Sequence, residues 1–146
     1  MTDQVDKPTK KVLLHENRFP IRWSDIDAFG HVNNAIYYRY FEQIRADWMT
    51  ELGYPLTINQ LTEGPTIVDA HCQFLAQILY PSNLKLTLYG GAPGRSSAEL
   101  FYELHDDKTG QLYTVGSTKM VWLDFEKGRS IPLPEKIRAL LPVKDE

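Results

Sequence analysis

The stretch from Arg22 to Glu42 reads RWSDIDAFGHVNNAIYYRYFE and marks the point where an extended segment gives way to a helix. After Gly30, apolar side chains recur about every four residues, the spacing of one face of an amphipathic helix. The stripe consists of Ile36, Tyr40, Ile44, Trp48 and Leu52, flanked by Tyr37 and Phe41. Asn33 or Asn34 is a suitable N-cap, and Gly53 stands where a left-handed residue would end the helix. We therefore expect a core-facing helix of about eighteen residues, roughly 27 Å long.

Alternation of apolar and polar side chains predicts strands on both sides of this helix. The predicted strands cover residues 12–23, 65–75, 84–89, 98–104 and 111–125. The sequences GGAPG at 90–94 and DDKTG at 106–110 predict turns between them, and Pro134 introduces a short C-terminal helix that runs through Leu141. In the second strand, alternate residues from Thr66 to Phe74 are expected to share one face.

The short connections between the later strands require antiparallel pairing, because parallel neighbours need long crossovers. The order of one strand, a long helix and four strands therefore predicts an α+β fold. One helix covers only one face of a five-stranded sheet, yet several outward positions are aromatic or mixed, namely Tyr89, Phe101 and Tyr113. We expect a second copy of the chain to complete the burial, in a homodimer or homotetramer.

Length and composition limit the possible classes of protein. The 146 residues suit a single domain, placed at 11–142, with polar tails at 1–10 and 143–146. A net charge of −3 argues against nucleic acid as a partner. The single cysteine, Cys72, cannot form an intramolecular disulfide, which favours a reducing compartment. Without a long apolar run or an apolar leader, we expect a cytoplasmic protein with no membrane partner.

Residues capable of chemistry concentrate just before the helix. Asp25 and Asp27 precede Gly30, His31 and Asn33, so carboxylates, an imidazole and free helix amides converge within about ten residues. A calcium loop beginning at the first aspartate would lack its ligands at positions 5 and 12, and no further His or Cys follows at zinc-ligand spacing. We therefore expect no metal.

The two aspartates invite different interpretations. An Asp before a helix most often caps it or forms a turn, and this interpretation is favoured for Asp25. For Asp27 function is favoured, because the unpaired amides of the helix N-terminus follow closely and attract negative charge. A carboxylate beside such an oxyanion site suits acyl transfer.

Other catalytic arrangements are absent from the sequence. There is no GxSxG elbow, and His71 and Cys72, as neighbours in a strand, point to opposite faces and cannot act as a base and nucleophile pair. The GGAPGR stretch lacks the GK[ST] ending of a P-loop and is interpreted as a hairpin loop. Its side chains Arg95, Ser96 and Ser97 could still contact a phosphate.

The run WSDIDAFGHVNNAIYYRYFE resembles the signature of the hotdog-fold thioesterases of the 4-hydroxybenzoyl-CoA thioesterase-like group, D-x-D-x-x-G-H-V-N-N before an aromatic-rich helix. The later segments HCQFLAQILYPSNLKLTLY, GRSSAEL and VWLDFEKGRSIPLPEKIRALL follow in the order of that family. The resemblance implies a helix wrapped by an antiparallel sheet, with sheets paired between protomers and dimers often stacked into tetramers. It also implies hydrolysis of acyl-CoA, or sometimes acyl carrier protein, thioesters without a cofactor, coenzyme A being part of the substrate.

By the same resemblance Asp27 is the catalytic carboxylate, which attacks the thioester or activates water. A backbone amide at the helix start, by position that of Asn34 or a close neighbour, holds the oxyanion. His31 and Asn33 would either hydrogen-bond water or the substrate carbonyl, or cap the helix. Gly30 and Tyr37 join Arg95, Ser96 and Ser97 as expected substrate-binding residues, although an aromatic stripe that includes Tyr37 is more often simply core.

Two alternatives remain at this point. A hotdog hydratase or dehydratase acting on enoyl or hydroxyacyl thioesters usually relies on an Asp/His dyad in a different local motif, which the HVNN run disfavours. A hotdog domain that binds acyl-CoA without cleaving it would protect the thioester, so release of free thiol separates it from a hydrolase.

Overall fold

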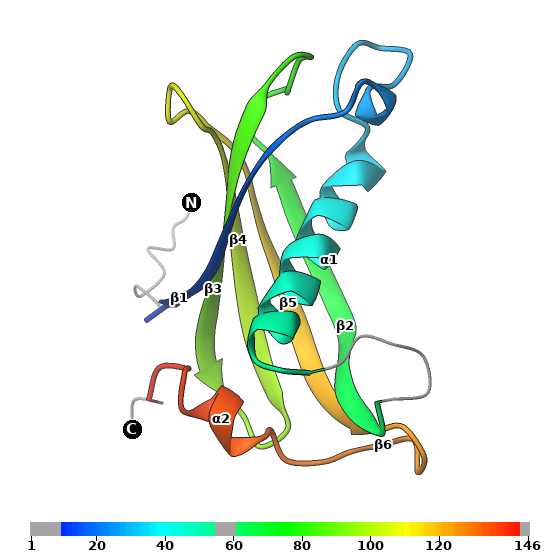
Figure 1. The fold of residues 1–146 in the computed structure, drawn as a ribbon, viewed down its shortest axis with the longest axis vertical. Helices are drawn as coiled ribbons and strands as arrows, with labels where there is room; N and C mark the ends of the chain where they lie inside the picture. Colours follow the sequence, from blue (N-terminus) through cyan, green and yellow to red (C-terminus); the bar gives the residue numbers. More distant parts are fainter. Residues whose placement is uncertain (1–9, 55–60, 144–146) are drawn as a thin grey trace, which may run out of the picture.

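A computed structural model describes residues 10–54 and 61–143. Five long strands and one long helix dominate it (Figure 1), and the helix α1 spans Asn34–Glu51. The strands are β1 (Val12–Pro20), β2 (Glu63–Phe74), β3 (Asn83–Pro93), β4 (Ser97–Asp106), β5 (Leu112–Asp124) and the short β6 (Arg129–Ser130). A 3-10 turn, η1 (Trp23–Asp25), follows β1, and a single helical turn, α2 (Glu135–Arg138), lies near the C-terminus.

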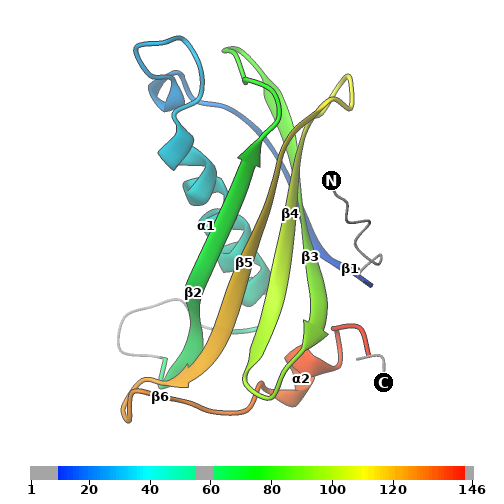
Figure 2. The same ribbon diagram turned by 180° about the vertical axis from the view of Figure 1, so that it is seen from behind.

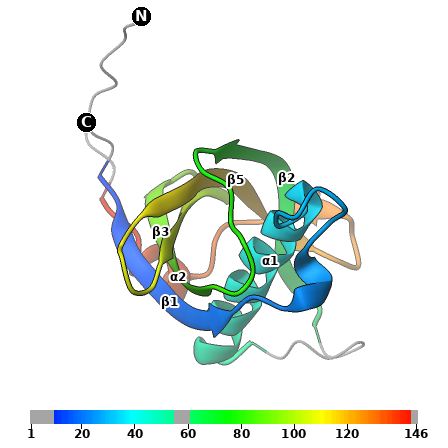
Figure 3. The same cartoon turned by 90° about the horizontal axis from the view of Figure 1, so that it is seen from above.

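The strands form one antiparallel sheet in the order β1-β3-β4-β5-β2, with β6 paired to β5. Seen from above in Figure 3, the sheet curls around α1, which lies on its concave side. This arrangement confirms the predicted α+β class and the hotdog fold. Figure 2 shows the opposite, convex face, over which the described part of the chain places no helix.

The core lies where α1 meets the middle strands. The ring of Phe41 stacks on that of Tyr102 in β4, with centroids 4.3 Å apart. Gly116 in β5 allows this close approach, because a Cβ atom there would lie 2.6 Å from the Phe41 ring. Trp48 and Trp122 are also fully buried. The helix therefore packs directly against the sheet through its aromatic residues.

The buried stripe of α1 is rotated slightly from the predicted one. Ile44 and Trp48 are buried as expected, but Ile36, Tyr40 and Leu52 are only partly buried. The fully buried positions are Tyr37, Phe41, Ile44, Trp48 and Met49. Tyr37 and Phe41, predicted to flank the stripe, are therefore part of its buried centre.

Several predicted boundaries were wrong. The first strand ends at Pro20 rather than residue 23, because the chain turns into η1. Strand β3 continues through the two glycines to Pro93, so the GGAPG sequence is mostly strand. There Gly90 lies so close to Leu141 and Leu14 that a Cβ atom would clash. Helix α2 stops at Arg138, and Pro134 is its N-cap rather than its first residue.

The prediction that alternate residues of the second strand share one face is also wrong. A register shift between Ile67 and Asp69 interrupts its alternation, as a β-bulge does. Val68 is consequently 56% exposed, whereas Ile67 packs against the core. Tyr113, predicted to face outward, is only 8% exposed, and its hydroxyl donates to Asp106 Oδ2 over 3.2 Å.

The turn at 106–110 is confirmed. Asp106 Oδ1 accepts from the amides of Lys108 and Thr109, and Gly110 has a φ of +77°. These bonds hold the pKa of the Asp106 carboxyl below its usual value. Most of the predicted tails lies outside the described residues. No helix within 10–54 or 61–143 is both long and apolar enough to cross a membrane.

Candidate active site

The loop between β1 and α1 folds back on itself before the helix begins. Ile26 and Val32 form an isolated antiparallel bridge, and the Asp27 amide donates to the His31 carbonyl over 3.0 Å. The Gly30 amide donates to the Asp27 carbonyl over 3.0 Å, and Gly30 has a φ of +85°, which L side chains rarely adopt. A tight turn therefore presents residues 27–31 at one end of the molecule, at the top of Figure 1.

Asp25 is held by several bonds. Its Oδ2 accepts from the Tyr40 hydroxyl over 2.7 Å and from the Arg22 amide over 3.1 Å. Its carbonyl accepts from the Asn33 amide over 3.0 Å. The turn-forming interpretation of Asp25 is thus confirmed, and the residue ties the loop to the first turns of α1.

The Asp25–Tyr40 bond is partly buried. Burial raises the pKa of the Tyr40 hydroxyl well above its usual value, and the hydrogen bond and negative charge of Asp25 raise it further. The hydroxyl therefore remains protonated and donates to the carboxylate throughout the neutral range.

Asp27 is much less constrained. Its Oδ1 accepts one bond, from the Phe29 amide over 2.9 Å, within the same turn. Across the described residues, no donor bonds its Oδ2, so one carboxylate oxygen is available to another molecule. This bond fixes the direction of the carboxylate without saturating it.

The helix begins immediately after this turn. Asn33 is the N-cap, and its Oδ1 accepts from the Ala35 amide over 3.0 Å. This confirms the capping interpretation of Asn33. The backbone amide of Asn34, the first residue of α1, has no acceptor anywhere in the described ranges. It lies at the positive end of an 18-residue helix, where an oxyanion is stabilised.

A hollow of about 750 Å³ opens beside these groups. Its lining comes from two segments far apart in the chain: Asp27, Phe29, His31, Val32, Asn33, Asn34 and Tyr37, together with Phe74, Leu75, Ala76 and Gln77. The second segment begins at Phe74, the last residue of β2, and just beyond it the Ile78 carbonyl accepts from the Val32 amide over 3.1 Å. A carboxylate and a free helix amide thus share the wall of one hollow, which both polar and apolar side chains line.

Two other predicted residues face the same hollow. Tyr37 is only 2% exposed, and its ring meets that of Phe74 edge-on at 4.9 Å. It is therefore both a core residue and part of the wall. The half-buried His31 makes no side-chain hydrogen bond to any described residue, so it does not cap the helix. Its role toward substrate stays a prediction.

The remaining predicted contacts lie elsewhere. Arg95 and Ser96 lie in the β3–β4 connection and Ser97 begins β4, at the end of the sheet opposite the Asp27 turn (Figure 1). The Arg95 carbonyl accepts from the Leu133 amide and from the Arg138 guanidinium, which places it beside α2. A single protomer therefore does not bring these side chains to the hollow.

Sequence reasoning missed the 74–77 segment. Phe74 was assigned to a strand, and no local signal marks the three residues after it as part of a site. Within 10–54 and 61–143 no group of three His, Cys, Asp or Glu side chains could hold a metal ion. Cys72 lies half-buried in β2, and burial raises the pKa of its thiol to about 11, which opposes a nucleophilic role.

Known proteins include chains that are similar to this one in sequence and fold. The family model described as the thioesterase-like superfamily matches residues 21–141. The solved structure of the PA2801 protein from Pseudomonas aeruginosa is 36% identical, with a TM-score of 0.81 over 87% of this chain and 97% of that one.

Two further relatives have names that state an activity. The structure of BH1999 gentisyl-coenzyme A thioesterase is 27% identical, with a TM-score of 0.75 over 85% of this chain and 99% of that one. The chloroplastic acyl-acyl carrier protein thioesterase ATL3 of Arabidopsis thaliana is 27% identical over 86% of this chain and 66% of its own length. Both names describe cleavage of an acyl thioester, one from coenzyme A and one from a carrier protein.

Proposed function

This chain belongs to the thioesterase-like superfamily, and we propose that it hydrolyses an acyl-CoA to the free carboxylic acid and coenzyme A. The observation that carries the proposal is the pairing of a half-engaged carboxylate, Asp27, with the free Asn34 amide on the wall of one hollow. A thioester carbonyl needs both a group that drives attack and a donor for the oxygen that becomes negative.

The Asn34 amide would bind the thioester carbonyl oxygen. Because the charge on that oxygen grows in the transition state, the bond strengthens as the reaction proceeds, and the helix dipole adds to it. Removal of one such donor in other enzymes costs about 10²–10³ in turnover. A backbone donor cannot be deleted by substitution, so the Asp27 side chain offers the practical test.

Asp27 can act in two ways. As a nucleophile, its Oδ2 attacks the thioester carbon, the C–S bond breaks to release the coenzyme A thiolate, and water then hydrolyses the mixed anhydride. As a general base, it takes a proton from a water that attacks the same carbon. After a single turnover in H₂¹⁸O, label in the Asp27 carboxylate would identify the nucleophilic route, with water attacking the aspartyl carbon of the anhydride, because the general-base route places ¹⁸O only in the released acid.

The decisive experiment measures free thiol with a chromogenic disulfide reagent. Aromatic, short, long and branched acyl-CoAs are compared, together with an acyl carrier protein thioester, because the named relatives act on both carriers. We expect hydrolysis by the wild type and near-complete loss in Asp27→Asn, with Asp25→Asn as the matched control. Binding of acyl-CoA without thiol release would instead favour the non-catalytic alternative, and addition of water to an enoyl thioester would favour a hydratase.

We further propose that the β3–β4 connection serves the site of a second copy. Strand β2 is an edge of the sheet, so it can pair with another strand. Antiparallel pairing of two β2 strands about a twofold axis reverses the partner end for end. The partner's end that carries Arg95, Ser96 and Ser97 would then lie on the same side as the Asp27 turn, where the phosphates of coenzyme A could be bound.

Mixed dimers test this arrangement. Asp27→Asn and Arg95→Ala subunits, each weak alone, should recover about a quarter to half of wild-type kcat/KM when co-expressed, because one site per heterodimer is then intact. A mixture no more active than its parents would mean that both residues serve the same protomer. Sedimentation at assay concentrations supplies the oligomeric state.

A further inference from the structure

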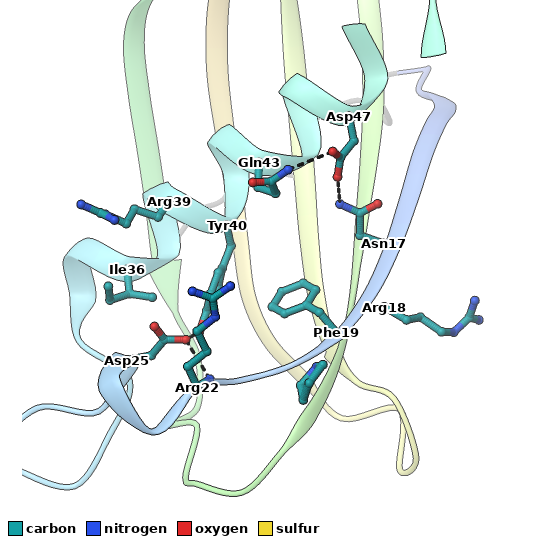
Figure 4. Close-up of a pocket in the computed structure, with 11 residues that line it drawn as sticks. Asn17, Arg18, Phe19, Arg22, Asp25, Ile36, Arg39, Tyr40, Gln43 and Asp47 are labelled. Atoms are coloured by element: carbon teal, nitrogen blue, oxygen red, sulfur yellow. Dashed lines mark hydrogen bonds between the residues drawn. The ribbon is translucent and has the colours of Figure 1, made fainter. Parts of the chain in front are cut away.

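A second hollow, of about 610 Å³, lies between β1 and α1 and shares no lining residue with the hollow at Asp27. Figure 4 shows it as a groove bounded by β1 on one side and α1 on the other. We call it the β1–α1 groove. Its volume falls within the range that holds small organic ligands, about 300–1,000 Å³.

The floor of the groove is apolar, and its two aromatic rings are tilted 57° to each other. The Phe19 ring from β1 and the Tyr40 ring from α1 meet there with centroids 4.9 Å apart, and Pro20 and Ile36 extend the surface. In Figure 4 the Phe19 ring lies between the strand and the helix. Such a floor favours a planar apolar body, since aromatic rings gain from offset or edge contacts.

One end of the groove carries positive charge that is not paired by any residue the structure describes. Arg22 and Arg39 line the groove, and neither forms an ion pair within the described residues. In Figure 4 the Arg22 side chain lies beside Tyr40. The third arginine there is different, because Arg18 pairs with Glu16 and Asp107 and points away from the groove.

The acidic groups of the groove are already engaged. The two oxygens of Asp47 accept from the amides of Asn17, over 2.7 Å, and Gln43, over 2.9 Å. Asp25 accepts from the Tyr40 hydroxyl. The amide oxygens of Asn17 and Gln43 receive no hydrogen bond from the described chain, so they form a polar end opposite Arg22.

We propose that the β1–α1 groove binds a free aromatic carboxylic acid, with its carboxylate at Arg22 and its ring against Phe19 and Tyr40. Arg22 supplies a planar pair of donors that matches a carboxylate, and guanidinium groups tolerate stacking beside aromatic rings. A hydroxyl on the far side of the ring would donate to the amide oxygens of Asn17 or Gln43. Such acids are the products of aromatic thioester hydrolysis, so this choice of ligand rests on the proposed function.

An occupant would lie against the back of the catalytic loop. The Tyr40–Asp25 bond forms part of the groove wall, and Asp25 also holds the Asn33 amide at the start of α1. The groove and the hollow are thus on opposite sides of the same loop. A bound acid would stabilise the loop from behind while leaving Asp27 accessible.

Calorimetric titration with benzoate, 4-hydroxybenzoate and 2-naphthoate tests the proposal, with benzamide as the uncharged control. The protein is Asp27→Asn, in which the groove is intact and hydrolysis is not needed. We expect one acid per chain and about tenfold weaker binding when Arg22→Gln is added, because one charge-assisted pair is lost. Arg18→Gln is the matched control and should leave the affinity unchanged.

Four results would overturn the proposal: no acid bound at millimolar concentration, equal affinity for benzamide, equal loss in Arg18→Gln, or no loss in Arg22→Gln. The last would also result if the acid bound only in the Asp27 hollow. Arg22→Glu adds a second measurement that does not depend on the size of one bond, since charge reversal should abolish binding. The Arg22 bond to Asp25 comes from the backbone amide, so these variants keep the turn.

The experiments can contradict acid binding in the β1–α1 groove and thioester hydrolysis independently of each other. If the acids bind in an Arg22-dependent manner but no thioester is cleaved by the wild type, the groove stands and the hydrolase assignment falls. If thioesters are cleaved but no acid binds, the hydrolase stands and the groove assignment falls.

Discussion

Asp25 and Asp27 lie two residues apart in the same loop, yet their surroundings are opposite. The Asp25 carboxylate is bonded by a partly buried tyrosine hydroxyl and a backbone amide. The Asp27 carboxylate receives one amide bond and faces a hollow of about 750 Å³. A carboxylate whose bonds are satisfied stabilises the fold, whereas one left partly unsatisfied beside a free helix amide can act on a substrate.

The largest effect is expected at Asp27. Asp27→Asn should lower kcat by about 100-fold or more, the range typical of a lost acid–base group, while thermal unfolding stays close to wild type. The substitution retains an oxygen for the Phe29 amide, so the turn is preserved. Thiol release and a melting curve on the same preparation check it, and retained turnover would remove Asp27 from the mechanism.

Asp25→Asn should show the reverse pattern. The neutral amide weakens the bonds from Tyr40 and Arg22, and we expect about 1–2 kcal/mol lower stability with a smaller loss of activity. Urea denaturation measures the first and thiol release the second. If stability were unchanged while activity fell as far as in Asp27→Asn, Asp25 would belong to the chemistry instead.

Two variants of Asn33 distinguish a role in capping the helix from a role in catalysis. Loss of the cap in Asn33→Ala should cost about 1 kcal/mol, whereas Asn33→Ser keeps an acceptor for the Ala35 amide and should remain stable. If Asn33 only caps, Asn33→Ser also keeps its turnover. A stable but inactive Asn33→Ser variant, found by the same two assays, would show that the side chain also contacts substrate.

The smallest effect concerns alkaline pH. The pKa of Tyr40 is raised in the folded protein, so its contribution to stability is present below about pH 10, the ordinary tyrosine pKa, and is lost as the pH rises through the folded value. Tyr40→Phe should therefore be less stable than wild type at pH 8, with the gap narrowing at strongly alkaline pH. Chemical denaturation across pH 8–12 measures this gap, and a constant difference would show that folding does not raise the pKa of the Tyr40 hydroxyl.

Much of the fold could be predicted because its signals are local. The Asn33 cap and Gly53, with a φ of +90°, bracket the helix, and the turn at 106–110 carries its own Asx bonds and glycine. The boundaries failed where distant packing overrode local pattern. Gly90 looked like a turn residue, yet it lies in a strand because Leu14 and Leu141 leave no room for a side chain.

The candidate site divides in the same way. The residues 27–34 form a continuous motif, so their spacing alone predicts that the Asp27 carboxylate lies near the helix N-terminus. The opposing wall at 74–77 depends on how β2 ends and on the bond between Val32 and Ile78, forty-six residues apart. Neither segment contains a local sequence pattern that predicts the contact between them.

By itself the sequence determined the long capped helix, the alternating strands and the turn-forming role of Asp25, because each depends mainly on residues within a few positions of one another. Only the tertiary structure decided which aromatic side chains became core and which lined the β1–α1 groove. It also decided that Arg95, Ser96 and Ser97 lie at the far end of the protomer from Asp27. Those outcomes follow from the curl and register of the sheet, which arise from contacts between strands far apart in the chain.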